Sequence, residues 1–355
     1  MGLRRNPRVE CEPGGVATRS RCRLIAGAES RAAAAHPCPD EHAREKLREG
    51  AEPWLHTRVF DATSGRLDAL SSAPTAPGQD RPATRQSGSM CGMDLAVEPP
   101  APWVVTRLRA AGCVFAEDEA RLLISCAETP TDLAVMVDRR AGGLPLEHVL
   151  GWAEFCGLRI AVDPGVFVPR RRTEFLVGQA IALAPPRAVV VDMCCGSGAV
   201  GAALVAALDR IELYAADVDP AAVQCARRNV ADAGGQVYEG DLFEPLPDAL
   251  HDRVDILVAN VPYVPTEEIR LLPPEARVHE PRVALDGGAD GLDVLRRVAA
   301  AAPRWLARGG HLLVETSEHQ ATHTAELFED NGLIPLVASS DELNATVIIG
   351  TRPAR

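Results

Sequence analysis

The sequence predicts an α/β fold, in which a small N-terminal helical domain precedes a mostly parallel sheet with an antiparallel edge strand. From residue 188 to the end, short apolar runs of strand length alternate with segments of helical periodicity. This alternation is typical of a parallel sheet covered by helices on both faces. Only the turn-forming residues 340–342 join the last two apolar runs, so these two strands are expected to pair antiparallel.

Residues 1–93 are rich in Arg, Ala, Pro, Ser and Gly and show no sustained hydrophobic period. Because such a composition buries little apolar surface, we expect residues 1–93 to be disordered. An alternative is that the protein starts at Met90 or Met93 and that the preceding residues are an upstream extension. The 11 acidic residues of this segment argue against a transit peptide.

Apolar residues recur at helical spacing from Val104 to about Arg140. Breaks near Gly112 and Thr129-Pro130 divide this stretch into several helices. The predicted domains are a helical substrate-recognition domain at 94–143, a connecting hairpin or linker at 144–187 and the main domain at 188–355. Strands of the main domain are predicted at 188–193, 211–218, 236–240, 255–259, 311–316, 334–339 and 345–351.

The charge distribution bears on the class of partner. Residues 94–355 hold 38 of the 49 acidic residues but only 23 of the 37 basic ones, a net charge of −15. Sequence-independent binding to a nucleic-acid backbone requires clustered basic charge, so we expect no direct nucleic-acid binding.

No run approaches the roughly 18 apolar residues that a membrane helix needs, so we expect a cytoplasmic protein that does not bind membranes. The ten cysteines include no C-x-x-C pair, so reduced thiols and no metal site are expected. We also expect a monomer.

A glycine loop lies between the first predicted strand of the main domain and the helix that follows it. Gly196, Gly198 and Gly201 match the pattern G-x-G-x-x-G. Glycines at such a place let the backbone approach a ligand beside the positive end of a helix dipole. The same residues could form a purely structural turn, so the loop alone is a weak indication.

Asp217 lies 21 residues after Gly196, at the end of the next predicted strand. A carboxylate there can accept hydrogen bonds from both ribose hydroxyls of an adenosine. Asp219-Pro220 begins a helix, so one of the two acids could cap that helix while the other binds the ligand. NAD and S-adenosylmethionine both satisfy these features.

The sequence Asn260-Val261-Pro262-Tyr263 follows the strand predicted at 255–259 and distinguishes the two cofactors. Hydride transfer has no need for this tetrad. Methylation of an amide nitrogen does, because the nitrogen lone pair is delocalised and must be held towards the methyl group. The side-chain oxygen of Asn260 and a backbone carbonyl can accept the two N–H bonds, and an aromatic ring can pack on the planar group. The alternative is an Asn-initiated turn with an ordinary proline.

With these residues, the chain from about 95 to 352 resembles the HemK/PrmC protein-(glutamine-N5) methyltransferases. The resemblance rests on the glycine loop, Asp217, the tetrad, and the stretches Leu144–Gly151, Phe155 with Gly157, Phe167–Arg170, Thr173-Glu174, Gly240–Phe243, Glu280–Leu292 and Gly309–Glu315. It implies a class I S-adenosylmethionine methyltransferase fold, Rossmann-like, and as acceptor the Gly-Gly-Gln glutamine of a peptide-chain release factor.

The resemblance also implies which residues form the site. Cofactor contacts are predicted at Asp192, Cys194, Cys195, Gly196, Ser197, Gly198, Asp217, Asp241, Leu242 and Asn260. The acceptor amide is predicted to lie against Asn260, Val261, Pro262 and Tyr263.

Two residues depart from the family pattern. Val261 stands where the family tetrad Asn-Pro-Pro-Tyr has its first proline, which adds a free N–H. Cys194 stands at the first glycine of the family loop Asp-x-Gly-x-Gly-x-Gly. Both indicate a divergent branch and leave open a different acceptor.

Three other functions compete with this interpretation. An N6-adenine DNA or RNA methyltransferase uses a similar tetrad, but the acidic main domain disfavours it. A non-catalytic S-adenosylmethionine-binding protein would explain the two departures, but Asn260, Tyr263 and Asp217 are all present. An NAD-dependent dehydrogenase rests on the glycine pattern alone.

Overall fold

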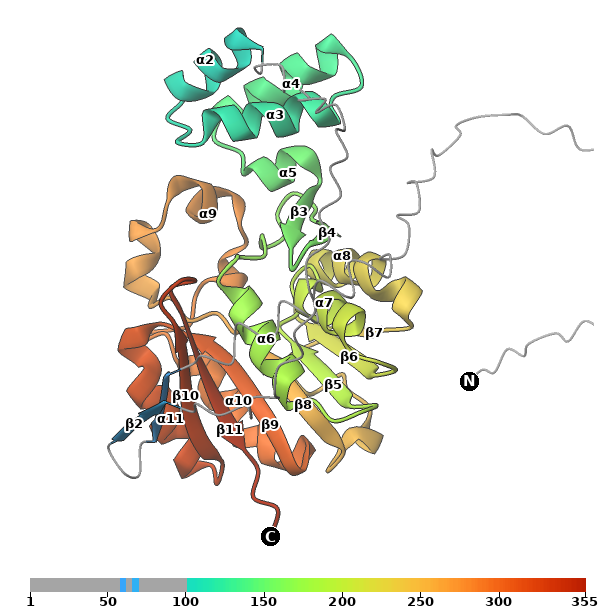
Figure 1. Ribbon diagram of the computed structural model, residues 1–355, viewed down its shortest axis with the longest axis vertical. Coiled ribbons are helices and arrows are strands. Elements are labelled where there is room, and N and C mark those ends of the chain that lie inside the picture. The colour runs from blue at the N-terminus through green and yellow to red at the C-terminus, as the bar shows by residue number, and fades with distance from the viewer. Residues whose placement is uncertain (1–57, 62–65, 70–100) are drawn as a thin grey trace, which may run out of the picture. The chain divides into compact units, whose positions relative to one another are not determined.

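The computed structural model describes residues 58–61, 66–69 and 101–355 (Figure 1). The main sheet has the strand order β2-β1-β10-β11-β9-β8-β5-β6-β7. The bounds of its strands are β1 (Arg58–Asp61), β2 (Arg66–Ala69), β5 (Val189–Met193), β6 (Glu212–Asp217), β7 (Gln236–Glu239), β8 (Val254–Ala259), β9 (Leu306–Thr316), β10 (Ile334–Ser340) and β11 (Ala345–Thr351).

The predicted α/β fold is confirmed. Strands β7, β6, β5, β8 and β9 pair in parallel with one another in this order, and β11 is antiparallel to both β9 and β10. Strand β9 begins at Leu306 rather than at the predicted 311. The sequence Arg308-Gly309-Gly310 suggests a turn, but a register shift between Val254 and Ile256 lets β9 continue through it.

Helices cover both faces of the sheet (Figure 1). One face carries α6 (Thr173–Leu183), α7 (Ala199–Ala207) and α8 (Pro220–Val230), and the other carries α10 (Asp293–Trp305) and α11 (Ala321–Asp330). Side chains alternate between the two resulting cores, because successive residues of a strand point to opposite faces. In β5, Val190 belongs to one core, and Val189 and Val191 belong to the other.

Helix α6 lies inside the segment that the sequence analysis assigned to a hairpin or linker. Its Phe175, Leu176 and Val177 are almost completely buried in the core beneath α7 and α8. A helix that is apolar all round shows no amphipathic period, which is why periodicity did not reveal it. The hairpin itself is present, as β3 (Trp152–Phe155) and β4 (Leu158–Ala161).

The predicted N-terminal helices are also present, as α2 (Pro102–Ala110), α3 (Ala116–Cys126), α4 (Pro130–Ala141) and the short α5 (Leu146–Leu150). They share a separate core that includes Leu108, Leu123 and Val137. The predicted break before Pro130 is confirmed, because the hydroxyl oxygen of Thr129 accepts the backbone N–H of Asp132 at 3.1 Å and caps α4.

Strands β1 and β2 lie within residues 1–93, for which the sequence predicted disorder; β1 pairs with β10. The rest of that prediction, including the start at Met90 or Met93, lies outside the described residues. The remaining described helices are η2 (Ala231–Ala233), η3 (Asp248–Leu250), η4 (Thr266–Leu271), α9 (Pro274–His279), η5 (Arg282–Ala284) and η6 (Glu318–Gln320).

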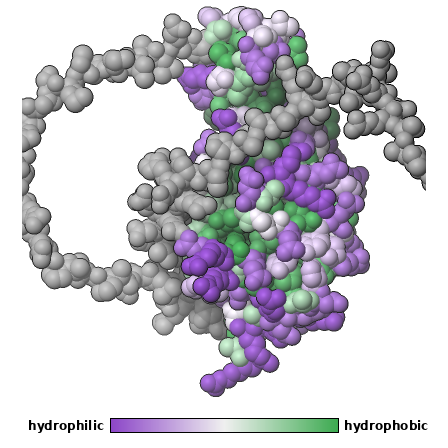
Figure 2. Space-filling view, turned by 90° about the vertical axis from the view of Figure 1, so that its right-hand side faces the viewer, coloured by the Kyte–Doolittle hydropathy of each residue, from purple (hydrophilic) through white to green (hydrophobic). Residues whose placement is uncertain are grey.

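The described surface is mixed in polarity. Figure 2 shows hydrophobic residues gathered in the middle of one face, with hydrophilic areas around them. Within the described segments, no helix has the length and apolar character to cross a membrane.

Candidate active site

Parallel register aligns the predicted site residues at the carboxyl edge of the sheet. Met193 lies opposite Ala216 on one side and Ala259 on the other, and Ala259 lies opposite Val314. The next residues along these strands are therefore neighbours: Cys194, Asp217, Asn260 and Glu315. This is the edge where open α/β sheets bind ligands, and β5 and β8 flank the point where the strand order reverses.

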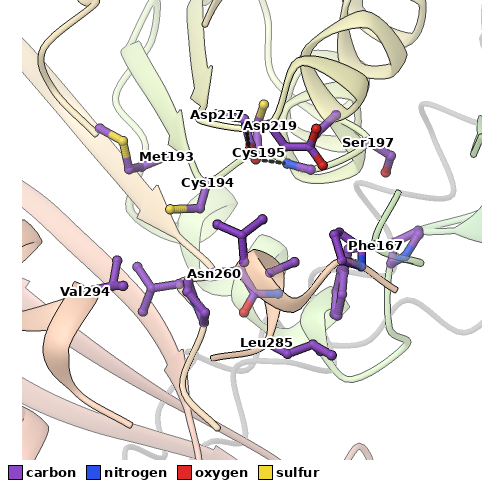
Figure 3. A pocket seen from close by; sticks show the side chains of 18 of the residues that line it. Phe167, Met193, Cys194, Cys195, Ser197, Asp217, Asp219, Asn260, Leu285 and Val294 are labelled. Atoms are coloured by element: carbon purple, nitrogen blue, oxygen red, sulfur yellow. Dashed lines mark hydrogen bonds between the residues drawn. The ribbon is translucent and has the colours of Figure 1, made fainter. Parts of the chain in front are cut away.

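A pocket of about 540 Å³ opens above this edge (Figure 3). Its wall includes these predicted residues: Asp192, Cys194, Cys195, Gly196, Ser197, Asp217, Asp241, Leu242, Asn260, Val261, Pro262 and Tyr263. Gly198 is the one predicted residue outside the wall. It is the N-cap of α7, and a Cβ there would lie 3.0 Å from Ala226, so this glycine permits close helix packing.

The loop after β5 bends through residues with positive φ. Cys194, Gly196 and Gly198 have φ values of 56°, 53° and 75°. Glycine adopts this left-handed conformation freely, whereas a residue with a Cβ does so at a cost of roughly 1–2 kcal/mol. Cys194 thus occupies a position suited to glycine. Burial raises the pKa of its thiol, and that of Cys195, so both thiols are protonated at neutral pH.

The two acids after β6 have different roles. Asp219 Oδ1 accepts the backbone N–H of Ala221 at 2.9 Å and caps α8. Asp217 instead accepts the N–H of Gly196 on Oδ2 at 2.8 Å and that of Asp219 on Oδ1 at 2.9 Å. Each carboxylate oxygen retains a lone pair that can accept a ligand hydroxyl. Burial raises the pKa of Asp217.

Asp192 supports the glycine loop from within the core. It is 2% exposed, and its Oδ2 accepts the backbone N–H of Gly201 at 2.9 Å. Burial raises the pKa of Asp192 to about 7. A Cβ at Gly201 would lie 3.1 Å from that oxygen, so glycine allows α7 to begin close to the sheet.

Asp241 and Leu242, two of the predicted cofactor contacts, border the pocket beyond β7. Asp241 accepts a hydrogen bond from Nη2 of Arg297 at 2.7 Å. Arg297 and Val294 extend from α10 into the same wall. The sequence analysis did not predict either residue, because α10 reaches this end of the pocket only through packing.

Asn260 lies in the middle of the pocket, between Cys194 and Leu285 (Figure 3). Within residues 101–355, its side-chain amide makes no hydrogen bond. Val261 next to it is 2% exposed, and its side chain packs into the core beside α10. The tetrad therefore presents an unpartnered amide to the pocket, on a backbone fixed by a buried side chain.

Tyr263 closes the tetrad and is anchored on both sides. Its hydroxyl oxygen accepts a hydrogen bond from Arg172, and its carbonyl oxygen accepts one from Gln320 at 3.0 Å. Arg172 also donates through Nε to Glu315 at 2.9 Å. Burial and the neighbouring Glu315 raise the pKa of Tyr263 to about 12, so the phenol is neutral.

A second arginine in the wall is held by a buried acid. Nη2 of Arg170 lies 2.6 Å from both carboxylate oxygens of Glu280, and its guanidinium lies 4.7 Å from the ring centroid of Phe167. Glu280 also accepts the backbone N–H of Val168. Arg170 and Glu280 lie in stretches that carried the family resemblance, but the sequence analysis predicted no role for them in the site.

Another part of the pocket wall, which we call the apolar end, is formed mainly by apolar residues, and its Leu285 lies on the side of Asn260 away from the glycine loop (Figure 3). The apolar end is formed by Phe155, Phe167, Leu272, Pro273, Ala276, Pro281, Val283, Ala284 and Leu285. In the same segment, Leu271, Val278 and Val283 have exposed fractions of 68%, 64% and 49%. Exposed apolar side chains beside a pocket can mark a binding surface.

Comparisons with known proteins identify the family. Residues 157–276 match the family described as "Methyltransferase small domain". The release factor glutamine methyltransferase of Geobacter sulfurreducens is 40% identical over 228 residues, which cover 63% of this chain and 79% of that protein. The corresponding protein of Mycolicibacterium smegmatis is 38% identical over 246 residues, 67% of this chain and 86% of that one.

A solved structure of a release factor-specific protein-(glutamine-N5) methyltransferase from Alicyclobacillus acidocaldarius is 26% identical, with a TM-score of 0.33. It covers 52% of this chain and 94% of that one. The sequence relatives match over most of their own length. The region that matches the family model contains the glycine loop, Asp217 and the tetrad. The chain is thus a methyltransferase and belongs to the family of release factor glutamine methyltransferases.

Proposed function

We propose that this enzyme transfers the methyl group of S-adenosylmethionine to the side-chain amide nitrogen of a glutamine, in the Gly-Gly-Gln sequence of a peptide-chain release factor. The observation that carries the proposal is the side-chain amide of Asn260. It lies in the pocket between the glycine loop and the apolar end, and within residues 101–355 it has no hydrogen-bond partner. Such an amide is available to a planar acceptor that needs both a donor and an acceptor group.

The loop after β5 fits the cofactor. No atom lies within 4 Å of a Cβ built on Gly196, so the space above this backbone is open to a ligand. Asp217 borders that space and suits the two ribose hydroxyls, and Leu242 offers an apolar surface for the adenine. When bound, S-adenosylmethionine supplies an electrophilic methyl group on a sulfonium.

The acceptor amide must be oriented, because its nitrogen lone pair is delocalised into the carbonyl group. In the proposed arrangement, Oδ1 of Asn260 accepts one N–H of the glutamine amide, and a backbone carbonyl of the tetrad accepts the other. The Tyr263 ring, fixed by Arg172, packs on the planar amide. These contacts turn the nitrogen towards the sulfonium methyl.

No general base is needed for the proton that must leave. An amide nitrogen that has gained a methyl group is cationic and strongly acidic, so its proton passes readily to water or to Oδ1 of Asn260. The neutral phenol of Tyr263 is a poor proton acceptor and serves as a packing surface. The proposed catalysis therefore rests on orientation rather than on acid–base chemistry.

The other expectations about partners are part of this proposal. We expect the helices at residues 101–150 to help recognise the acceptor protein. Their core is separate, and Arg140 links them to the pocket wall through a 2.6 Å ion pair with Glu275 of α9. We also expect a cytoplasmic monomer that does not bind nucleic acid directly, consistent with its net charge of −12.

A labelling experiment tests the proposal. The enzyme is incubated with tritiated S-adenosylmethionine and a lysate from a strain that lacks it, and the labelled residue is identified by mass spectrometry. Protein and nucleic-acid fractions are counted separately, with a lysate that receives no enzyme as the control. We expect the label on a glutamine of a release factor. Label in nucleic acid, or on another type of residue, would contradict the proposal.

A further inference from the structure

Arg172 enters the pocket wall immediately before α6, and two contacts fix its guanidinium. Nε donates to Oε1 of Glu315 at 2.9 Å, and Nη2 donates to the hydroxyl oxygen of Tyr263. The guanidinium carbon lies 5.7 Å from the centroid of the Tyr263 ring. The two partners come from separate parts of the fold, Tyr263 from the loop after β8 and Glu315 from the end of β9, so the side chain is held in one orientation.

Glu315 anchors this arrangement. Its side chain is 2% exposed, whereas that of Arg172 is 43% exposed. The negative charge is thus behind the wall and the positive charge is at its surface. Glu315 Oε2 is buried and has no partner in the described part of the chain, so the carboxylate depends on Arg172 for charge compensation.

The two contacts leave most of the donors of Arg172 unused. A guanidinium has five N–H groups. One is directed to Glu315 and one to Tyr263, and within residues 101–355 the other three have no partner. Because Arg172 lines the pocket together with Tyr263 and Pro262, these donors lie beside the predicted place of the acceptor amide.

Arg170 in the same wall is different. Its Nη2 lies within 2.6 Å of both oxygens of Glu280, and its guanidinium packs on Phe167. Arg170 thus holds two parts of the wall together. Arg172, by contrast, contacts Tyr263 of the tetrad directly, so its free donors lie next to the predicted acceptor.

We infer that Arg172 is an acceptor-binding residue, whose free N–H groups donate to main-chain carbonyl oxygens of the peptide segment that carries the reactive amide, and that Glu315 positions it. This inference rests on the proposed function. An extended peptide next to a reactive side chain presents carbonyl oxygens, which are acceptors only, and a guanidinium matches them with donors only. The interaction holds the peptide in both the ground and the transition state, so it should affect binding of the acceptor more than turnover.

Steady-state kinetics with the unmethylated form of the acceptor protein that the labelling experiment identifies test the inference. Arg172→Ala should raise KM for the acceptor at least tenfold, change kcat less than threefold and leave Kd for S-adenosylmethionine within twofold. The KM of Arg172→Lys for the acceptor should lie between those of the wild type and Arg172→Ala, because an ammonium keeps the charge but cannot bind Glu315, Tyr263 and a carbonyl together. The matched control is Arg171→Ala, since Arg171 is an exposed neighbour outside the pocket wall and should leave all three constants unchanged.

The outcomes are separable. If the wild-type enzyme methylates its acceptor and Arg172→Ala behaves like Arg171→Ala, the inference is wrong and the proposed function stands. If the wild type binds S-adenosylmethionine but methylates no protein, the proposed function fails, and with it the assignment of an acceptor to Arg172. A fall in kcat with unchanged KM would also overturn the inference, because it would give Arg172 a role in the chemical step.

A spectroscopic readout tests the positioning by Glu315 without any acceptor. The chain has three tyrosines, so the phenolate absorbance of Tyr263 can be isolated by subtracting the titration of Tyr263→Phe. The charged groups that act on Tyr263 are Glu315, Arg172 and Arg170. Glu315→Gln removes a negative charge and should lower the Tyr263 pKa from about 12. An unchanged Tyr263 pKa in Glu315→Gln would show that Glu315 does not act on Tyr263 and Arg172.

Discussion

The backbone N–H of Gly196 donates to Oδ2 of Asp217 at 2.8 Å, across 21 residues of sequence. This bond ties the glycine loop after β5 to the acid after β6. Both carboxylates border the pocket, but Asp219 caps α8 whereas Asp217 holds the glycine loop, so we assign the cofactor hydroxyls to Asp217. The sequence left open which of the two acids caps the helix and which one binds.

Asp217→Ala should weaken S-adenosylmethionine binding by roughly 1.5–3 kcal/mol, the usual scale for hydrogen bonds to a charged group. Calorimetric titration measures the dissociation constant directly. Asp219→Ala is the matched control, and it should cost about 1 kcal/mol of folding stability through loss of the cap while cofactor affinity stays the same. If the two variants exchange these effects, the assignment of the two acids is reversed.

Asp192 predicts a pH dependence of stability. Burial raises its pKa from 3.8 to about 7, so the native chain binds this proton more tightly than the unfolded chain does. The stability that this proton contributes is fully present below pH 3.8 and is lost as the pH rises to about 7. Relative to Asp192→Asn, which cannot ionise, the wild type should lose at most about 4 kcal/mol over this interval. Urea unfolding of the ligand-free proteins at several pH values measures both free energies of unfolding. A wild-type value that stays constant or rises with pH relative to that of Asp192→Asn would contradict the prediction.

Cys194 predicts a backbone effect. Because its φ of 56° suits glycine, Cys194→Gly should keep the free energy of unfolding within about 1 kcal/mol of the wild type, or raise it. Cys194→Val should lower it by about 1 kcal/mol or more, since a β-branched residue is strained at positive φ. Denaturant titration of both variants decides. An equal loss of the free energy of unfolding in both variants would mean that the contacts of the thiol, and not the backbone conformation, make cysteine favourable at this position.

Val261→Pro restores the proline of the family tetrad and should leave turnover within about tenfold of the wild type, because the carbonyl acceptor is kept and φ is fixed near −65°. In the described part of the chain, the backbone N–H of Val261 has no hydrogen-bond partner, so its removal should cost little stability. Turnover on the labelled acceptor and a thermal midpoint suffice as measurements. A loss of activity beyond tenfold would indicate that this N–H binds the acceptor.

Most strands of the main domain could be predicted because they are compact apolar runs, as in Val189–Met193. The glycine loop, the acid and the tetrad each follow one of these strands, and this placement marked the carboxyl edge of the sheet. Helix α6 could not be predicted, since its apolar residues surround it on all sides. Strands β1 and β2 were missed for a different reason: a strand of 4 residues gives no periodic signal.

The cluster of Arg172, Tyr263 and Glu315 could not be predicted from the sequence either. Arg172, Tyr263 and Glu315 are 91 and 52 residues apart along the chain, and only the register of β8 with β9 and the start of α6 bring them together. Charged residues are common in any sequence, and nothing in the residues around Arg172 distinguishes it from its neighbour Arg171. The pairing depends on tertiary structure.

The central claim is that Asn260 orients the acceptor nitrogen, and turnover of Asn260→Ala at saturating S-adenosylmethionine and acceptor tests it most directly. Orientation is realised mainly in the transition state, so turnover should fall at least about a hundredfold, or roughly 2.7 kcal/mol of barrier. Cofactor affinity, measured in parallel, should change much less, because the glycine loop and Asp217 are intact. If Asn260→Ala methylates the acceptor at a rate near that of the wild type, the tetrad is not the catalytic site and the account is wrong.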